Sequence, residues 1–218
     1  MSTFARSSWD FLLDLVFPRQ CLGCGEYSTW LCQDCTTLLP LALRELQLPH
    51  SPQLDKLWFV ADFHEPMVSK LVKTCKYQGV RDLGPILGRL INSEIQKSSL
   101  VGDFLTSVIL PVPVHSRRMR ERGFNQTIEI AKGLEIQLSG QLVYRVNNTL
   151  HQADLDLASR LKNIESAFVF HRVENIPKRV ILLDDVVTTG ATMNEIAKVL
   201  KNNGVEEVWG LAFAHSMD

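Results

Sequence analysis

Two adjacent carboxylates, Asp184 and Asp185, lie between an apolar run and a turn rich in hydroxyl groups. The preceding residues Val180–Leu183 are all apolar, which predicts a strand buried on both faces. The turn Thr188–Thr192 supplies hydroxyls and a glycine that can adopt positive φ, so successive backbone N–H groups can converge on an anion. From about Thr192 apolar residues recur at helical spacing, and the N-terminus of that helix would direct its dipole at the same anion. The segment therefore predicts a site for a phosphorylated sugar.

The two carboxylates are unsuited to form one acid/base pair, because neighbouring side chains on a strand point to opposite faces. They are better placed to accept hydrogen bonds from sugar hydroxyls, directly or through magnesium-bound water. The alternative is an ordinary strand–turn–helix with a polar N-cap. The candidate residues form one continuous run: Asp184, Asp185, Val186, Val187, Thr188, Thr189, Gly190, Ala191 and Thr192.

Four clustered cysteines form a second constellation. They are two Cys-x-x-Cys pairs separated by seven residues: Cys21 and Cys24, then Cys32 and Cys35. Each pair can place two thiolates on one ion, so the four predict a tetrahedral structural zinc site with no open position for chemistry. An iron–sulfur cluster is the main alternative, since disulfides are rare in cytoplasmic chains and a redox pair would explain only one of the motifs.

A basic segment, His115–Gly123, lies between a predicted strand and a predicted helix. It holds four arginines within six residues: Arg117, Arg118, Arg120 and Arg122. Guanidinium groups bind phosphate oxygens bidentately and keep their charge, so a loop of this kind suits a pyrophosphate leaving group. A merely solvated charged loop is the alternative.

The segment from Asn148 to Asn163 is polar and basic and lies between two predicted strands. One interpretation is a lid that closes over a reacting sugar and excludes water. The other is an amphipathic surface helix, because Leu155, Ala158 and Leu161 have helical spacing.

Predicted strands alternate with predicted helices after about residue 50, which indicates an α/β fold with a mostly parallel, doubly wound sheet. In such a sheet, ligands bind beyond the carboxyl ends of the strands, so the arginine loop and the Asp184 run are expected to face one cleft. The expected strands are Leu57–Ala61, Ser107–Val114, Gln141–Arg145, Ala167–Phe170, Arg179–Asp184 and Glu207–Phe213, and the expected helices are Met67–Cys75, Asp82–Gln96 and Phe124–Leu138.

The composition is that of a globular protein, with 218 residues, 45% hydrophobic and 22% charged residues and a net charge of -1. A net charge close to zero does not attract the whole protein to nucleic acid or to an anionic membrane. Any such binding therefore requires a local basic patch. Prolines at 40, 49 and 52 place the expected domain boundary near residue 50, giving units of 1–50 and 51–218. The apolar segment Phe11–Phe17 is too short to span a bilayer and lacks the features of a secretory signal, so we expect a cytoplasmic protein.

The Val180–Thr192 run resembles the type I phosphoribosyltransferases, whose motif for phosphoribosyl pyrophosphate (PRPP) has this order of residue types. With the other motifs, the chain resembles the ComF family, the competence protein F or amidophosphoribosyltransferase-like group, over nearly its whole length. The residues that carry the resemblance are the paired cysteines, Lys76–Gly79, Pro111–Pro113, the stretch Arg117–Gln126, Thr149 and Gln152, Arg160 and Asn163, Ala167 and Phe168, and the Asp184–Asp185 run.

The resemblance implies a type I phosphoribosyltransferase fold with an N-terminal zinc-finger-like module. It implies PRPP binding with Mg²⁺, the 5'-phosphate on Thr188–Thr192, pyrophosphate facing the arginine loop, and a hood that includes Gln152, Arg160 and Asn163. It also implies a role in natural transformation, in which incoming single-stranded DNA is handled in the cytoplasm. It supplies no acceptor nucleophile.

Two functions follow. The first is a phosphoribosyltransferase in which an acceptor displaces pyrophosphate from PRPP. The second is a non-catalytic protein that senses PRPP and binds single-stranded DNA or partner proteins of DNA uptake and recombination. For the second function Tyr27, Trp30 and Tyr77 are the candidate stacking residues. The alternative is that these aromatic side chains pack under the cysteine hairpin.

Overall fold

The computed structural model describes residues 18–47, 51–114, 116–139, 142–145 and 167–216. The chain forms two compact units, residues 1–40 and 41–218. The boundary predicted near residue 50 stays a prediction. Within the described residues no helix is both long and apolar enough to cross a membrane.

The N-terminal unit is a small knuckle followed by a short helix. Gln20 and Tyr27 pair as an antiparallel bridge, and Gly25 closes the turn with φ of +81°, a conformation that favours glycine. Helix α2 (Gln33–Thr37) follows, with Cys32 as its N-cap. The knuckle and the helix each carry one pair of the cysteines.

The second unit is built on a six-stranded sheet, counted over the described residues, with the order β1-β2-β8-β7-β3-β4. All neighbouring pairs are parallel except the edge pair β1 and β2. The strands are β1 (Arg44–Glu45), β2 (Lys56–Asp62), β3 (Val108–Pro111), β4 (Gln137–Leu138), β7 (Arg179–Val187) and β8 (Glu207–His215). This arrangement confirms the predicted α/β class with a mostly parallel sheet.

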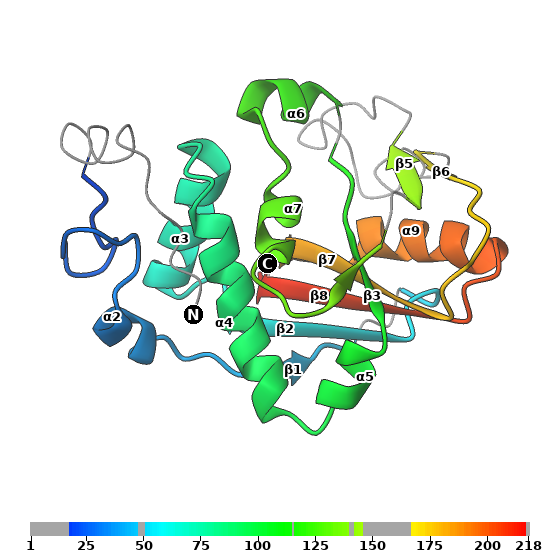
Figure 1. Ribbon diagram of the computed structural model, residues 1–218, viewed down its shortest axis with the longest axis horizontal. Coiled ribbons are helices and arrows are strands. Elements are labelled where there is room, and N and C mark those ends of the chain that lie inside the picture. The colour runs from blue at the N-terminus through cyan, green and yellow to red at the C-terminus, as the bar shows by residue number, and fades with distance from the viewer. Residues whose placement is uncertain (1–17, 48–50, 115, 140–141, 146–166, 217–218) are drawn as a thin grey trace. The chain divides into compact units, whose positions relative to one another are not determined.

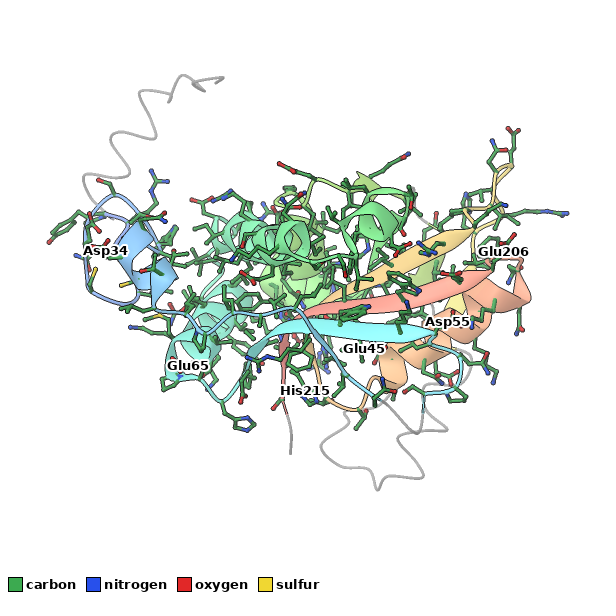
Figure 2. The ribbon with its side chains drawn as sticks, turned by 90° about the horizontal axis from the view of Figure 1, so that it is seen from below. Asp34, Glu45, Asp55, Glu65, Glu206 and His215 are labelled. Atoms are coloured by element: carbon green, nitrogen blue, oxygen red, sulfur yellow. The ribbon has the colours of Figure 1, made fainter. Side chains whose placement is uncertain are left out.

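Both faces of the central strands are covered, which explains their nearly continuous apolar sequence. Val180 and Leu182 of β7 belong to a core formed with α9 (Ala191–Asn202), whereas the alternate residues Ile181 and Leu183 point to the opposite face. Figure 2 shows helices on both sides of the sheet, with Asp55 and Glu206 at the amino ends of strands and His215 at a carboxyl end.

The other helices are α3 (Pro66–Tyr77), α4 (Leu83–Lys97), α5 (Val101–Leu105), α6 (Ser116–Arg122) and α7 (Gln126–Ala131). Helix α4 packs against α3, α5 and α7, and α7 contacts β3 and β7. A separate two-stranded antiparallel sheet, β5 (Val143–Arg145) and β6 (Phe168–Phe170), lies beside α9 (Figure 1).

Three local predictions were wrong. The arginine-rich segment forms helix α6, because arginine is a good helix former and the Arg117–Glu121 pair supports a turn at i,i+4 spacing. The helix expected over Phe124–Leu138 ends at Ala131, and strand β4 follows it. The strands near 143 and 168 pair with each other instead of joining the main sheet.

Helices α4 and α7 approach closely at glycines, which leads to a stability prediction. A Cβ added at Gly88 would overlap the carbonyl oxygen of Ile130 and lie 2.8 Å from the Cα of Gly133. We expect Gly88→Ala to lower the free energy of unfolding by about 2 kcal/mol, the usual scale of overpacking, as measured by urea unfolding.

The matched control is Gly102→Ala in α5, where an added Cβ meets nothing within 4 Å. Its free energy of unfolding should equal or slightly exceed that of the original chain, since alanine favours a helix over glycine. Equal stabilities of the two variants would show that α4 and α7 do not pack as described.

Candidate functional site

The candidate site lies at the switch point of the parallel sheet. From β3 the chain continues to the edge strand β4, and from β7 it crosses to β8 on the other side, so the loops after β3 and β7 diverge. Ligands of open α/β sheets bind in such a crevice. A cleft of about 720 Å³ occupies this position, and its wall includes Val112–Val114 after β3, Asp184–Val186 near the end of β7, and Thr192 in the first turn of α9.

The acidic pair lies inside β7, because the strand continues through Val187. Asp185 is buried, and its Oδ1 lies 2.9 Å from Lys76 Nζ and accepts a hydrogen bond from Val186 N. Its Oδ2 is buried and has no hydrogen-bond partner among the described residues. A buried oxygen of this kind fits a ligand hydroxyl or a water of Mg²⁺, which prefers oxygen ligands.

Asp184 lies on the strand face opposite to Asp185, and its Oδ1 accepts a hydrogen bond from Asp185 N. Burial, followed by the charge of Asp185, raises the pKa of Asp184 from the ordinary 3.8 to about 8. In the free site Asp184 is therefore mainly protonated at neutral pH, and a cation bound there would favour the ionised form.

The turn after β7 leads directly into the N-terminus of α9. Gly190 is the N-cap of α9 with φ of +70°, and Ala191 N lies 3.4 Å from Thr189 Oγ1. Asn194 Oδ1 accepts from Gln53 N at 3.0 Å, which ties α9 to the segment before β2. A small hollow of about 100 Å³, lined by residues 184 and 186–193, opens at this helix N-terminus.

The arginines of α6 differ in position. Arg118 and Arg122, one turn apart, line the cleft, whereas Arg117 and Arg120 do not belong to its lining. Arg122 donates to Gln126 Oε1 at 3.1 Å, and its guanidinium lies 5.5 Å from the ring centre of Tyr77.

Sequence reasoning did not assign Lys76, Gln126 or Arg145 to the site, yet all three line the cleft. Lys76 belongs to the Lys76–Gly79 motif that carries the resemblance, but no local signal pairs it with a carboxylate more than a hundred residues later. Arg145 was expected in a strand, without any indication of where that strand lies. The hood candidates Gln152, Arg160 and Asn163 lie outside the described residues.

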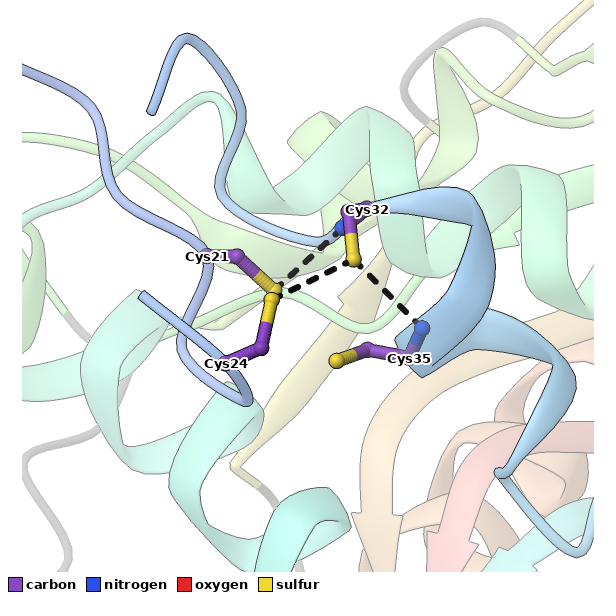
Figure 3. A group of neighbouring side chains, drawn as sticks. All are labelled: Cys21, Cys24, Cys32 and Cys35. Carbon is purple, nitrogen blue, oxygen red and sulfur yellow. Dashed lines mark hydrogen bonds between the residues drawn. The ribbon is translucent and has the colours of Figure 1, made fainter. Parts of the chain in front are cut away.

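The four cysteines of the N-terminal unit come together as the sequence predicted (Figure 3). Their sulfurs all lie within 4.8 Å of one another, and those of Cys24 and Cys32 are 3.6 Å apart. Tetrahedral zinc with Zn–S bonds of about 2.3 Å requires sulfurs about 3.8 Å apart. The donor set therefore fits a structural zinc ion and leaves no position for a reactant.

Backbone N–H groups already point at these sulfurs. Cys32 N lies 3.4 Å from Cys21 Sγ, and Cys35 N lies 3.5 Å from Cys32 Sγ. Burial opposes a charge on Cys21, but hydrogen bonds from backbone N–H groups outweigh it and lower its pKa to about 6. Such bonds stabilise thiolates, the form that binds metal.

The fold and the cleft define a phosphoribosyltransferase-type domain, and residues 129–216 match the family described as "Phosphoribosyl transferase domain". The chain belongs to the ComF family of competence protein F and its relatives, as its motifs predicted.

Three relatives illustrate the range of this family. The chain is 33% identical over 207 residues to "Competence protein F" of Haemophilus influenzae, covering 91% of this chain and 86% of that protein. It is 34% identical over 178 residues to "DNA utilization protein YhgH" of Escherichia coli strain K12, covering 77% and 75%. It is 26% identical over 133 residues to "Competence protein ComFC" of Streptococcus pneumoniae, covering 61% and 56%.

Proposed function

We propose that the cleft binds PRPP with Mg²⁺. The observation that carries the proposal is the meeting of three kinds of group in one cleft: the acidic pair of β7, the N-terminus of α9, and the cations Lys76, Arg118 and Arg122. The 5'-phosphate would lie on Thr188–Thr192, where backbone N–H groups and the helix dipole favour an anion. Asp184 and Asp185 would hold the ribose hydroxyls and the waters of Mg²⁺.

The pyrophosphate group would face the cations. Lys76 is bound to Asp185 at 2.9 Å and lies beside Tyr77, whose ring Arg122 covers. A bound Mg²⁺ would stabilise the negative charge that develops on the departing pyrophosphate. The lysine and arginine side chains would add to this stabilisation, because their positive charges are already in place before the bond breaks.

As a transferase, the protein would catalyse one displacement. A lone pair of the acceptor forms a bond to C1 of the ribose as the bond from C1 to the pyrophosphate oxygen breaks and its electrons leave with pyrophosphate. The proton of the acceptor passes to solvent.

The test is calorimetry with the full chain. We expect one PRPP per chain in the presence of Mg²⁺, and weaker binding of ribose 5-phosphate or of pyrophosphate alone. A parallel assay follows pyrophosphate release with pooled acceptors. Absence of PRPP binding would contradict the proposal, whereas binding without release would favour a PRPP sensor over an enzyme.

A second candidate function is the handling of incoming single-stranded DNA in the cytoplasm, together with proteins of DNA uptake and recombination. The relatives' names refer to competence and to DNA utilization. The supporting observation is Tyr77, which is 73% exposed at a cleft that also holds Arg118 and Arg122. An exposed aromatic ring beside cations suits a stacked base and its phosphate.

This function predicts a strong dependence on salt. The affinity for an oligothymidine should fall with salt by a slope of about 0.7 per phosphate contacted, as measured by fluorescence anisotropy. Tyr77→Ala should weaken binding by about tenfold, the scale of one stacked base. Leu105→Ala, which removes a side chain that is 49% exposed in α5, is the control. A salt-independent affinity would count against direct contact.

A further inference from the structure

We infer that Gln126 is a positioning residue of the pyrophosphate site: its side-chain oxygen and the ring of Tyr77 hold the guanidinium group of Arg122 at the cleft through contacts that carry no opposing charge. This inference rests on the proposed function and adds a residue to its pyrophosphate side. All three residues line the cleft.

The contact between Arg122 and Gln126 spans the bend between two helices. Arg122 is the last residue of α6, and Gln126 is the first residue of α7. Gly123 makes the bend with φ of +76°, and its N–H donates to Met119 O to close α6. The four-residue spacing is therefore not that of one continuous helix, and the contact depends on the bend.

Buried hydrogen bonds fix the start of α7 on both sides of Gln126. The side chains of Asn125 and Thr127 are buried, and both lie within hydrogen-bond distance of Val112 O, at 3.2 and 3.1 Å. Asn125 Oδ1 also accepts from Thr127 N at 3.0 Å. Val112 itself lines the cleft. Gln126, which is only 5% exposed, is therefore held firmly before any ligand binds.

The chemistry of the guanidinium group fixes the orientation of the Gln126 amide. A guanidinium group has only donors, so the atom 3.1 Å from Arg122 Nη1 must be the amide oxygen. The same guanidinium group lies 5.5 Å from the ring centre of Tyr77. An amide oxygen and an aromatic ring both attract a cation, although neither carries a net charge.

The neutral character of these contacts distinguishes Arg122 from Arg179 at the start of β7. Arg179 pairs with the carboxylates of Asp103 and Glu207, which offset its charge. Within the part of the chain that the structure describes, no carboxylate forms an ion pair with Arg122. Arg122 is therefore oriented by its neighbours and keeps its charge for an anion in the cleft, as the stabilisation of departing pyrophosphate requires.

The test is a double-mutant cycle on PRPP affinity, measured by calorimetry with the full chain and Mg²⁺. Gln126→Met keeps the length of this buried side chain but removes its oxygen. It should weaken PRPP binding by about tenfold, the scale of one charged hydrogen-bonded contact. In the Arg122→Ala background the same change should cost less than about twofold, because the group that Gln126 positions is absent. Ribose 5-phosphate, which lacks the pyrophosphate, should bind equally well to Gln126→Met and to the original chain.

Gln126→Glu separates position from charge. It keeps an oxygen beside the guanidinium group but offsets the charge, so PRPP affinity should fall at least as far as in Gln126→Met. Gln96→Met is the matched control, because it makes the same change at an exposed residue of α4 outside the cleft lining. Its PRPP affinity should equal that of the original chain.

Four results would overturn the inference: unchanged PRPP affinity in Gln126→Met, an equal loss with and without the Arg122 side chain, an equal loss for ribose 5-phosphate, or undiminished PRPP affinity in Gln126→Glu. Retained binding of ribose 5-phosphate shows that each variant is folded. Failure of the original chain to bind PRPP would instead overturn the proposed function, and this inference with it.

Discussion

Replacing both Asp184 and Asp185 by asparagine is expected to weaken PRPP binding in the presence of Mg²⁺ by about 100-fold or more, the scale of two lost charged contacts. Asparagine keeps the size of each side chain but removes the charge that attracts Mg²⁺ and half of the acceptor capacity. Calorimetry with PRPP at constant Mg²⁺ measures the change.

The control for this double variant is Glu174→Gln, which makes a carboxylate-to-amide change on an exposed loop. Its PRPP affinity should equal that of the original chain. Unchanged affinity in the double variant would show that the acidic pair does not hold the ribose or the metal.

The two single variants should differ because the two carboxylates have different surroundings. Asp185→Asn removes the partner of Lys76, whose ammonium group lies 2.9 Å from Asp185 Oδ1. Lys76 then gains freedom to meet pyrophosphate, which offsets part of the loss. Asp184 has no comparable cation at hydrogen-bond distance among the described residues, so Asp184→Asn should cost the larger share of affinity for Mg²⁺–PRPP.

The raised pKa of Asp184 gives the same binding reaction a pH dependence. Its pKa is about 8 in the free protein, so below that pH it is mainly protonated. Binding near Mg²⁺ requires the ionised form and must release a proton. Affinity is therefore expected to rise with pH toward about 8 and to level off above it.

Calorimetry in two buffers of different ionisation enthalpy measures this proton release directly. In Asp184→Asn the proton release measured near pH 8 should disappear. The proton release that comes from PRPP's own phosphate, at about pH 6, should remain. Equal proton release by both proteins would contradict the assignment.

The strand, turn and helix around the acidic pair could be predicted because each has a local signal. The apolar run Val180–Leu183 specified a buried strand, and Gly190 and the apolar spacing after it specified the turn and α9. The strand end was harder to place, since Val186 and Val187 extend the pairing with β8 past the carboxylates.

The other walls of the cleft depend on contacts between distant segments. Lys76 meets Asp185 only because α3 ends beside β7, and Arg145 reaches the cleft only because β5 pairs with β6 away from the main sheet. The high charge density of residues 116–122 favoured the prediction of a loop. These residues form helix α6 instead, because arginine is a good helix former and Arg117 pairs with Glu121 at i,i+4 spacing. Sequence patterns specify single elements well, but the meeting of side chains across elements is set by packing.

The largest stability effect is expected in the N-terminal unit when its four-cysteine site is disrupted. This unit has few buried apolar side chains in its described part, namely Cys21, Leu31, Cys32 and Leu39. A core of this size cannot offset the entropy of ordering the chain, so we expect four thiolates on one ion to supply most of its stability, roughly 10–16 kcal/mol in comparable zinc peptides. Cys32→Ser is therefore expected to abolish metal binding and to expose residues 18–40 to rapid amide hydrogen exchange.

Elemental analysis by mass spectrometry should give one zinc per original chain and much less in Cys32→Ser. Cys75→Ala is the matched control, because Cys75 is a buried thiol of the other unit and lies outside the cluster. It should retain the metal. If the analysis instead finds iron and the protein has a visible absorption band, the site holds an iron–sulfur cluster and not zinc. Full metal content in Cys32→Ser would contradict the four-cysteine site.

Residues 41–218 form their own compact unit, and this unit contains the cleft. PRPP affinity should therefore survive the loss of the metal. A parallel loss of PRPP affinity would show that the N-terminal unit takes part in binding.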